Sequence, residues 1–201
     1  MRHNITSIKD LNSVLNDIIP SIKNPQNLYT GRDRSNFNQR PREILANWLI
    51  CSVLNSELDE GVWTFGEDPM GGDGLIINRS SGTGLPTEHV FIPPPEPPAN
   101  DSVEQLFLGA VEHKNKKGRK YATGKHLVIF VEGIERQWYP NNVSKRIRGQ
   151  HAFDSVWAVG LQEADRDDYK YWVVCLDECP CPCFIVSVNV DKVEWLVEQI
   201  Q

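Results

Sequence analysis

Apolar residues recur at helical spacing in several parts of the chain, and this pattern predicts amphipathic helices. Four helices are expected: 5–23, 41 to about 56, 103 to about 117, and a C-terminal helix that begins at Asp191. Pro20 is expected to stop or kink the first helix, and Pro41 suits the first turn of the second, where a missing N–H costs least. Asp101 or Ser102 can cap the third helix. Residues 24–40 are polar and rich in turn formers, and they predict a connection.

Short apolar runs between turn-forming residues predict strands. They are expected at 61–65, 74–78, 87–92, 126–133, 155–162, 169–177 and 183–190. The first three are closely spaced and predict an antiparallel meander, while 126–133 has the length of a buried strand. The proline-rich segment 93–100 cannot form regular structure, because proline lacks an N–H and fixes φ. Residues 134–152 are expected to be irregular or partly helical.

This order of elements predicts an α/β fold with a mixed central sheet flanked by helices. Two parts are expected: an N-terminal helical arm and connection over 1–40, and a single α/β domain over 41–201. With 201 residues, 40% of them apolar, the chain is long enough to bury a core. No apolar run has the length of a transmembrane helix and the N-terminus lacks the pattern of a secretory signal, so we expect a cytoplasmic protein without a membrane partner.

The net charge of −6 argues against a protein that coats nucleic acid through bulk charge. The basic residues are nevertheless concentrated: six lie between Lys114 and Lys125, with no acidic residue among them. Two interpretations stay open, a solvated helix end whose cations suit its dipole and a surface that contacts phosphates. The candidates for nucleic-acid contact are Lys116, Lys120, Lys125, Lys145, Arg146 and Arg148.

Two carboxylates stand near the starts of neighbouring predicted strands, Asp73 before 74–78 and Glu88 within 87–92. Carboxylates brought together in this way supply the oxygen ligands that Mg²⁺ prefers. Asp68 in the preceding loop is an alternative to Asp73. The ordinary interpretation also stays open, because Asp-Gly is a common turn and Glu88 can be a surface residue.

The order of helix with Glu43, strand with Asp73, strand with Glu88, lysine-rich helix and buried strand resembles the PD-(D/E)XK nuclease superfamily, which has the restriction-endonuclease-like fold. The resemblance covers about residues 41–131 and implies a core of helix, three strands, helix and strand. It implies that Asp73 and Glu88 bind the metal and that Glu43 is the additional helix acid of some members. The sequence departs from the pattern at Val90, which stands where the ExK triplet has its lysine.

Some members of the superfamily take this lysine from the following helix, and Lys114 and Lys117 lie three residues apart on that helix. The resemblance therefore implies a catalytic set of Asp73, Glu88, Lys114 and Lys117, with Mg²⁺ as cofactor and DNA phosphodiesters as substrate. It equally allows a degenerate relative that binds DNA without cutting it. The alternative from another class is a non-catalytic module for protein–protein interaction. The sequence contains no GxSxG, Walker or HExxH motif to favour a different enzyme.

Four of the five cysteines crowd into the segment CLDECPCPC: Cys175, Cys179, Cys181 and Cys183. Their spacing argues against a zinc site, because zinc ribbons use two CxxC pairs that lie well apart in the sequence. A tight turn with buried or free thiols is the expected structure. A module stabilised by zinc at these cysteines is kept as a third alternative.

Overall fold

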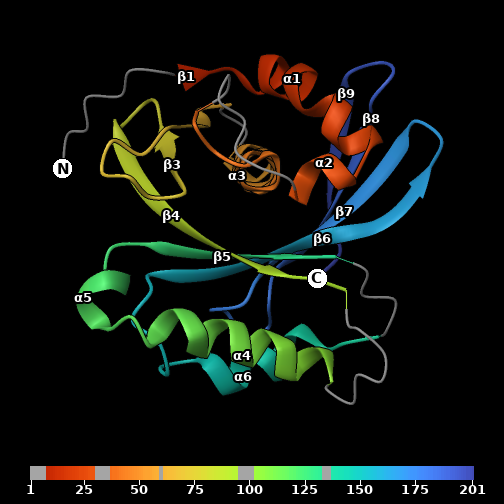
Figure 1. Cartoon of the computed structure of the whole chain (residues 1–201). Helices are drawn as coiled ribbons and strands as arrows, with labels where there is room; N and C mark the ends of the chain where they lie inside the picture. Colours follow the sequence, from red (N-terminus) through yellow and green to blue (C-terminus); the bar gives the residue numbers. More distant parts are fainter. Residues whose placement is uncertain (1–7, 30–36, 59–60, 95–101, 133–136) are drawn as a thin grey trace.

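A computed structural model of the chain describes residues 8–29, 37–58, 61–94, 102–132 and 137–201 (Figure 1). The described part is a mixed α/β structure, in which one sheet of nine strands has helices on both faces. The strands are β1 (Ile8–Lys9), β2 (Trp63–Gly66), β3 (Gly74–Asn78), β4 (Thr83–Ile92), β5 (His126–Val131), β6 (Ser155–Asp165), β7 (Asp168–Cys175), β8 (Cys183–Asn189) and β9 (Glu194–Gln199). The helices are α1 (Leu11–Lys23), α2 (Gln26–Tyr29), α3 (Pro41–Leu58), α4 (Val103–Asn115), α5 (Arg119–Ala122) and α6 (Pro140–Ile147).

The strands lie in the sheet in the order in which they occur in the chain. β2, β3 and β4 form the predicted antiparallel meander, and β6 to β9 are also antiparallel to one another. β4, β5 and β6 are parallel, so the chain must cross over between them. α4 and α5 form the first crossover and α6 the second, and all three lie on one face of the sheet (Figure 1). The predicted mixed sheet and the order of helix, three strands, helix and strand are confirmed.

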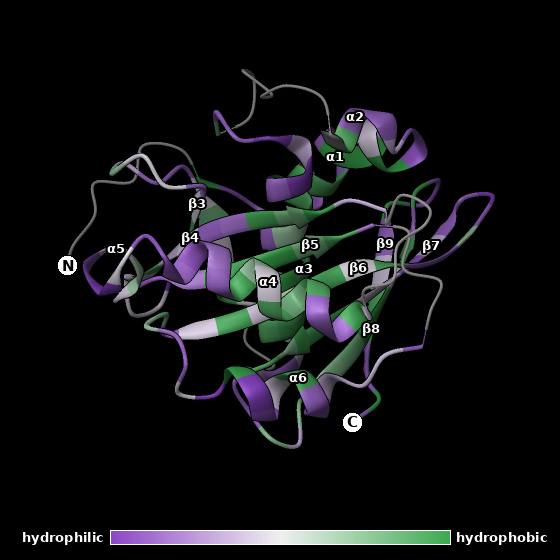
Figure 2. Cartoon of the chain, turned by 60° about the horizontal axis from the view of Figure 1, so that its bottom comes forward, coloured by the Kyte–Doolittle hydropathy of each residue, from purple (hydrophilic) through white to green (hydrophobic). Residues whose placement is uncertain are grey.

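The two faces of the sheet bury two separate hydrophobic cores. On one face α1, α2 and α3 pack on the sheet, and Trp48 of α3 meets Trp195 of β9 with ring centroids 5.2 Å apart. On the other face Phe107 of α4 stacks on Trp138 at 4.5 Å. Figure 2 shows the result as mostly hydrophobic central strands, with helices in which hydrophobic and hydrophilic residues are mixed.

The N-terminal helix α1 begins after Asp10, whose side chain accepts a hydrogen bond from the Ser13 N–H. Pro20, expected to stop or kink this helix, lies inside it, and the helix ends at Lys23. The segment expected as an arm packs into the same core as α3, because Val14, Leu15, Ile18 and Ile22 are buried there. The Trp48 indole N–H also donates to the Leu11 carbonyl over 2.9 Å, which ties α1 to α3. No helix in the described part is long and apolar enough to span a membrane.

The predicted C-terminal helix is wrong, because the chain forms strand β9 there and pairs with β8. Val193, Leu196 and Ile200 have helical spacing, but Trp195 and Val197 have strand spacing. The strand packs the partly buried Trp195 and Val197 against the core and leaves Leu196 exposed, as is Ile200 just after the strand. Pairing with the free edge of β8 thus decides between two patterns that the short segment supports equally. Of the proposed caps of α4, Ser102 forms a capping box with Gln105, while Asp101 lies outside the described residues, as do residues 95–100 of the proline-rich segment.

Candidate functional site

Glu88 lies on β4, in the centre of the sheet, and is only 7% exposed. Side chains alternate along a strand, so Glu88 faces α4 and α5 while its neighbours Thr87 and His89 face α3. The contacts agree with this: Glu88 meets Lys114 of α4 and Tyr121 of α5, and the His89 ring lies 3.1 Å from the Asn47 side chain of α3. The strand therefore presents a buried carboxylate to the helix layer that carries the basic residues.

Three side chains from different elements converge on the Glu88 carboxylate. Lys125, in the turn before β5, places its Nζ 2.7 Å from Oε1. Lys114 of α4 places its Nζ 3.5 Å from Oε2, and the Tyr121 hydroxyl donates a hydrogen bond to the same oxygen. The buried acid is thus surrounded by two ammonium groups and a hydroxyl donor.

These partners decide the ionisation of Glu88. Burial by itself would raise its pKa, but the hydrogen bonds from Lys125 and Tyr121 and the charges of both lysines lower the pKa below the ordinary glutamate value. Burial and the negative charge of Glu88 raise the pKa of Tyr121, so its hydroxyl keeps its proton. Glu88 is accordingly an ionised carboxylate at neutral pH with Tyr121 as a donor.

The predicted lysines take different places around this carboxylate. Lys114 is buried beside Glu88, whereas Lys117 is exposed and lies further out, with its Nζ 3.1 Å from the Tyr121 hydroxyl. Val90, on the same face of β4 as Glu88, packs against the hydrophobic core under α4. The two ammonium groups beside Glu88 therefore come from residues that are distant from it in sequence.

Asp73 lies directly before β3, beside β4. Its Oδ2 accepts a hydrogen bond from the His89 N–H over 2.8 Å, and its own N–H donates to the Thr87 carbonyl over 3.2 Å. These two backbone groups belong to the residues on either side of Glu88, so Asp73 is anchored to the backbone next to the buried acid.

Glu43 and Asp68, the other two candidate acids, are held by their own loops. Glu43, in the first turn of α3, accepts a hydrogen bond from the Arg40 N–H over 2.9 Å. Burial, together with the negative charge of Asp73, raises the pKa of Glu43, which places the two acids within electrostatic reach of each other. Asp68 accepts hydrogen bonds from the Met70 and Gly72 N–H groups, so it closes its own turn.

No group of three or more His, Cys, Asp or Glu side chains in the described residues is arranged as a ready metal site. The chemistry of the donors nevertheless fits a hard cation, because Glu88 is ionised and Asp73 presents a second carboxylate beside the same stretch of β4. Magnesium binds through few protein carboxylates and keeps several waters, so two such groups are a sufficient protein contribution.

A buried polar cluster behind Glu88, on the α3 face of the sheet, was not predicted. It consists of Gln39, Asn47, Thr87 and His89, each of which is almost fully buried. Burial lowers the pKa of His89 to about 4, so its ring is neutral at physiological pH. Gly74 fits this cluster because a Cβ there would lie 2.4 Å from the Asn47 amide nitrogen. The sequence contained one signal for this cluster: some of its polar residues stand at positions where the helix or strand pattern requires an apolar residue.

The contacts of Tyr121 and Lys125 with Glu88 were not predicted from the sequence. The proposed contact of Lys125 with nucleic acid stays a prediction. The proximity of these residues to Glu88 depends on the pairing of β4 with β5, which places Thr87 opposite His126 and so brings Lys125 beside Glu88. Sequence spacing alone does not contain that register.

The remaining basic candidates form an exposed surface at one end of the α4–α6 layer. α4 and α6 run side by side, since Glu104 accepts from the Tyr139 N–H near their starts and Asn115 donates to the Gln150 carbonyl near their ends. This brings two basic groups to the same end of the molecule. The exposed members are Lys116, Lys117, Arg119 and Lys120 after α4, and Lys145, Arg146 and Arg148 at the end of α6.

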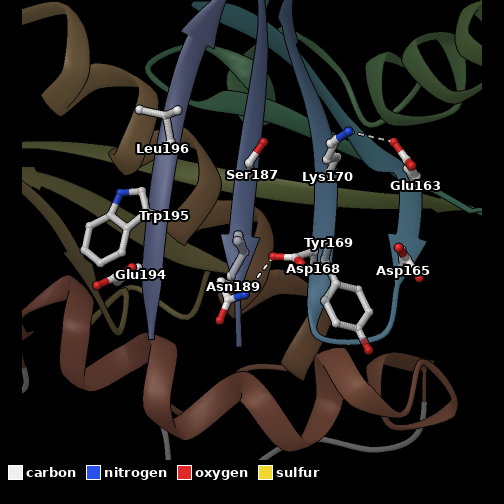
Figure 3. A pocket seen from close by; sticks show the side chains of 11 residues that line it. Glu163, Asp165, Asp168, Tyr169, Lys170, Ser187, Asn189, Glu194, Trp195 and Leu196 are labelled. Atoms are coloured by element: carbon white, nitrogen blue, oxygen red, sulfur yellow. Dashed lines mark hydrogen bonds and ion pairs between the residues drawn. The ribbon is translucent and has the colours of Figure 1, made fainter. Parts of the chain in front are cut away.

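Two hollows mark the opposite ends of this charge distribution. One of about 410 Å³ lies at the basic end between Asn115, Arg119 and Gln150. Another of about 450 Å³ lies over β6 to β9 and is lined by Glu163, Asp165, Asp168 and Glu194 among others (Figure 3). The slightly larger hollow is therefore the wrong place for a phosphate, because its carboxylates repel anions.

The C-terminal cysteines lie around the turn between β7 and β8. Cys175, Cys181 and Cys183 are buried and Cys179 is exposed. Burial raises the pKa of Cys175 to about 12 and that of Cys183 to about 11, so both are thiols at neutral pH. The Cys181 thiol donates to the Glu178 carbonyl over 3.3 Å. That these residues do not bind zinc stays a prediction.

Comparison of the chain with protein-family models, with curated proteins and with solved structures finds no match. Function must therefore be inferred from the site itself. Its distinguishing feature is an ionised, buried glutamate that touches two lysines and a tyrosine, beside an aspartate that directly precedes the neighbouring strand.

Proposed function

We propose that the chain is a restriction-endonuclease-like, Mg²⁺-dependent protein that hydrolyses phosphodiester bonds in DNA. The observation that carries this proposal is the contact of Glu88 with both Lys114 and Lys125. These lysines supply in space the charge that Val90 cannot supply in the ExK triplet. A variant of the PD-(D/E)XK site with its lysine on the following helix accounts for this arrangement.

The order of the elements supports the same proposal. α3 is followed by the meander of β2, β3 and β4, then by α4 and α5, then by the parallel strand β5. Asp73 precedes the second strand of the meander and Glu88 lies on the third, as the superfamily resemblance implies. The fold assignment at this finer level remains part of the proposal.

In this account Asp73 and Glu88 would hold Mg²⁺, and Glu43 is proposed as the additional helix acid. The ion, when bound, supplies a water of lowered pKa and polarises a phosphoryl oxygen. The residues of the chain do the rest: Lys114 donates to the phosphoryl oxygen that gains charge in the transition state, and Lys125 keeps Glu88 ionised. Tyr121 fixes the orientation of the Glu88 carboxylate through its hydroxyl.

The basic end of the helix layer would bind the DNA backbone. Lys117 connects the two regions, since it touches Tyr121 of the site and belongs to the exposed basic group. Backbone binding through such residues carries no sequence information and weakens with salt. Lys116, Lys120, Lys145, Arg146 and Arg148 are proposed to act in this way.

Cleavage of supercoiled plasmid tests the proposal and separates an active enzyme from a degenerate relative. We expect nicked or linear product with Mg²⁺ or Mn²⁺, none with EDTA, and none from Glu88→Gln. The matched control is Glu112→Gln, an exposed change on the same helix layer that leaves the site intact. DNA binding without cleavage in either metal would favour the degenerate relative, and neither binding nor cleavage would sink the proposal.

A further inference from the structure

The end of the sheet formed by β6 to β9 presents a face of exposed and half-buried side chains in two cross-strand rows (Figure 3). Register fixes the rows: Leu196, Ser187, Lys170 and Glu163 in one, and Glu194, Asn189, Asp168 and Asp165 in the other. The alternate residues Trp195, Val188 and Tyr169 point to the opposite face and pack in the core with α1 and α3. Lys170 is the one cation in the two rows, and Glu163 already neutralises it over 2.8 Å.

The outermost strand, β9, carries a regular pattern on this face. Its outward side chains are Glu194, Leu196 and Glu198, and Ile200 continues the alternation after the strand. All four side chains are exposed. Leu196 is 60% exposed and Ile200 is 63% exposed, and these two are among the few large hydrophobic residues of the described chain that are exposed. Acid and apolar side chains therefore alternate along the edge of the sheet.

The backbone of β9 is an available partner as well. No strand in the described part of the chain pairs with its outer edge, so its outward N–H and C=O groups face away from the sheet. Edge strands of this kind accept an added strand, with affinity from backbone hydrogen bonds and specificity from the side chains that lie opposite.

The charges of Glu194 and Glu198 determine which kind of strand can pair with the outer edge of β9. Antiparallel pairing of two copies of β9 centred on Leu196 would set Glu194 opposite Glu198, and like charges directly opposite are destabilising. If the two copies paired with Val197 at the centre, Leu196 would lie opposite Glu198, and no pair of opposite charges would form. The same acids that protect the edge from a second copy attract a segment of the opposite charge.

We propose that the outer edge of β9 binds an extended basic segment of a partner protein. In that segment lysine or arginine lies opposite Glu194 and Glu198, and apolar side chains lie opposite Leu196 and Ile200. The carboxylates of Asp168 and Asp165, which line a hollow of about 450 Å³ further along the same face, add to the negative potential that attracts a basic segment. This interaction is independent of the nuclease proposal, because the edge strand β9 and the Glu88 site on the central strand β4 lie in different parts of the sheet.

The test uses the full chain and a short fluorescent peptide in which leucine and lysine alternate at every second position, with threonine between them. We expect saturable binding by fluorescence anisotropy that is lost when alternate backbone nitrogens of the peptide are methylated. Glu194→Lys/Glu198→Lys should weaken binding about tenfold, since two favourable charge pairs become repulsive. The same variant should bind a peptide with glutamate in place of lysine.

Glu57→Lys/Glu67→Lys is the matched control, because it makes the same change in net charge at exposed acids away from β9. Equal loss of binding in this control, or equal binding of the methylated peptide, would overturn the proposal in favour of bulk charge. Failure of the wild type to bind the lysine peptide would overturn it as well. Should charge reversal unfold the chain, as circular dichroism would show, Glu194→Gln/Glu198→Gln repeats the test with a milder change.

Discussion

The Lys125 ammonium lies 2.7 Å from Oε1 of Glu88, although the two residues are 37 positions apart in sequence. Parallel pairing of β4 and β5 sets Thr87 opposite His126, and the residues next to this pair, Glu88 and Lys125, meet on the α4 side of the sheet. The contact is therefore a property of strand register. It assembles with Lys114 and Tyr121 into the charged site on which our functional account depends.

Replacement of Glu88 by glutamine should destabilise the fold. The change leaves Lys114 and Lys125 without their shared counter-charge in a buried site, which costs about 2–3 kcal/mol. Chemical denaturation at pH 7 measures the loss. Glu112→Gln, which removes an exposed ion pair with Lys116, should cost less than about 1 kcal/mol. Equal losses in the two variants would contradict the buried pairing.

The same glutamate should make stability depend on pH in the acid range. Because the folded pKa of Glu88 lies below its unfolded value, its contribution is complete above the unfolded pKa and is lost as pH falls through the folded pKa. Melting temperature measured from neutral pH downwards should thus fall more steeply in the wild type than in Glu88→Gln. Parallel curves would show that Glu88 is not stabilised as a carboxylate.

His89 should add a second pH dependence, nearer to neutrality. Burial holds its folded pKa at about 4, below the ordinary histidine value of about 6.5, so the unfolded chain binds the extra proton between these limits. Stability should therefore fall as pH decreases through this window. His89→Gln should flatten the curve there, and NMR titration of the wild-type ring should show no protonation at pH 6. A ring that titrates near 6.5 would contradict its burial.

Tyr121→Phe should weaken the site while it preserves the ring contact with Phe153. Removal of the hydroxyl donor takes away one of the interactions that lower the pKa of Glu88, so that pKa should rise. We expect a loss of about 1.5–3 kcal/mol in the free energy of unfolding, typical of a hydrogen bond to a charged group. Denaturation at two pH values measures both effects, and an unchanged stability would argue against this contact.

Neutralising the basic end should weaken DNA binding without an effect on the Glu88 site. For Lys116→Gln, Lys120→Gln and Arg148→Gln combined, the slope of log K against log salt should fall by about 0.9 for each DNA phosphate that the variant no longer neutralises. Lys170→Gln and Lys192→Gln, near the acidic end, serve as controls. Anisotropy with a labelled duplex in Ca²⁺ measures the slopes, and a wild-type slope in the basic-end variant would exclude this surface.

The elements with a strong local pattern were predicted well from sequence. β3 occupies the predicted range 74–78, and β5 lies within the predicted buried strand, because continuous apolar runs between turn residues leave few alternatives. The C-terminal segment was predicted wrongly because Val193 to Ile200 supports both periods, and only the free edge of β8 decides between them. Local pattern is sufficient where one period dominates and insufficient where a tertiary partner chooses.

The same distinction between local pattern and tertiary contact applies to the candidate site. The sequence singled out Asp73, Glu88 and Lys114 because each stands at a marked position in the order of elements, and their roles stay predictions. The contacts of Tyr121 and Lys125 with Glu88 were not predictable, since both depend on the register of β4 and β5 and on the path of α5. The cluster around His89 and Asn47 requires α3 to pack over that particular part of the sheet, which no spacing in the sequence specifies.

The claim that Lys114 replaces the missing lysine of the triplet is the centre of this account, and one cleavage experiment tests it most directly. Plasmid cleavage with Mg²⁺ is compared for the wild type, Lys114→Met, and Val90→Lys/Lys114→Met, with circular dichroism to establish that each is folded. We expect Lys114→Met to lose about 10²–10³-fold in rate, and the double variant, which restores a lysine on the same face of β4 as Glu88, to recover part of it. A folded Lys114→Met variant that cleaves at the wild-type rate would contradict the account.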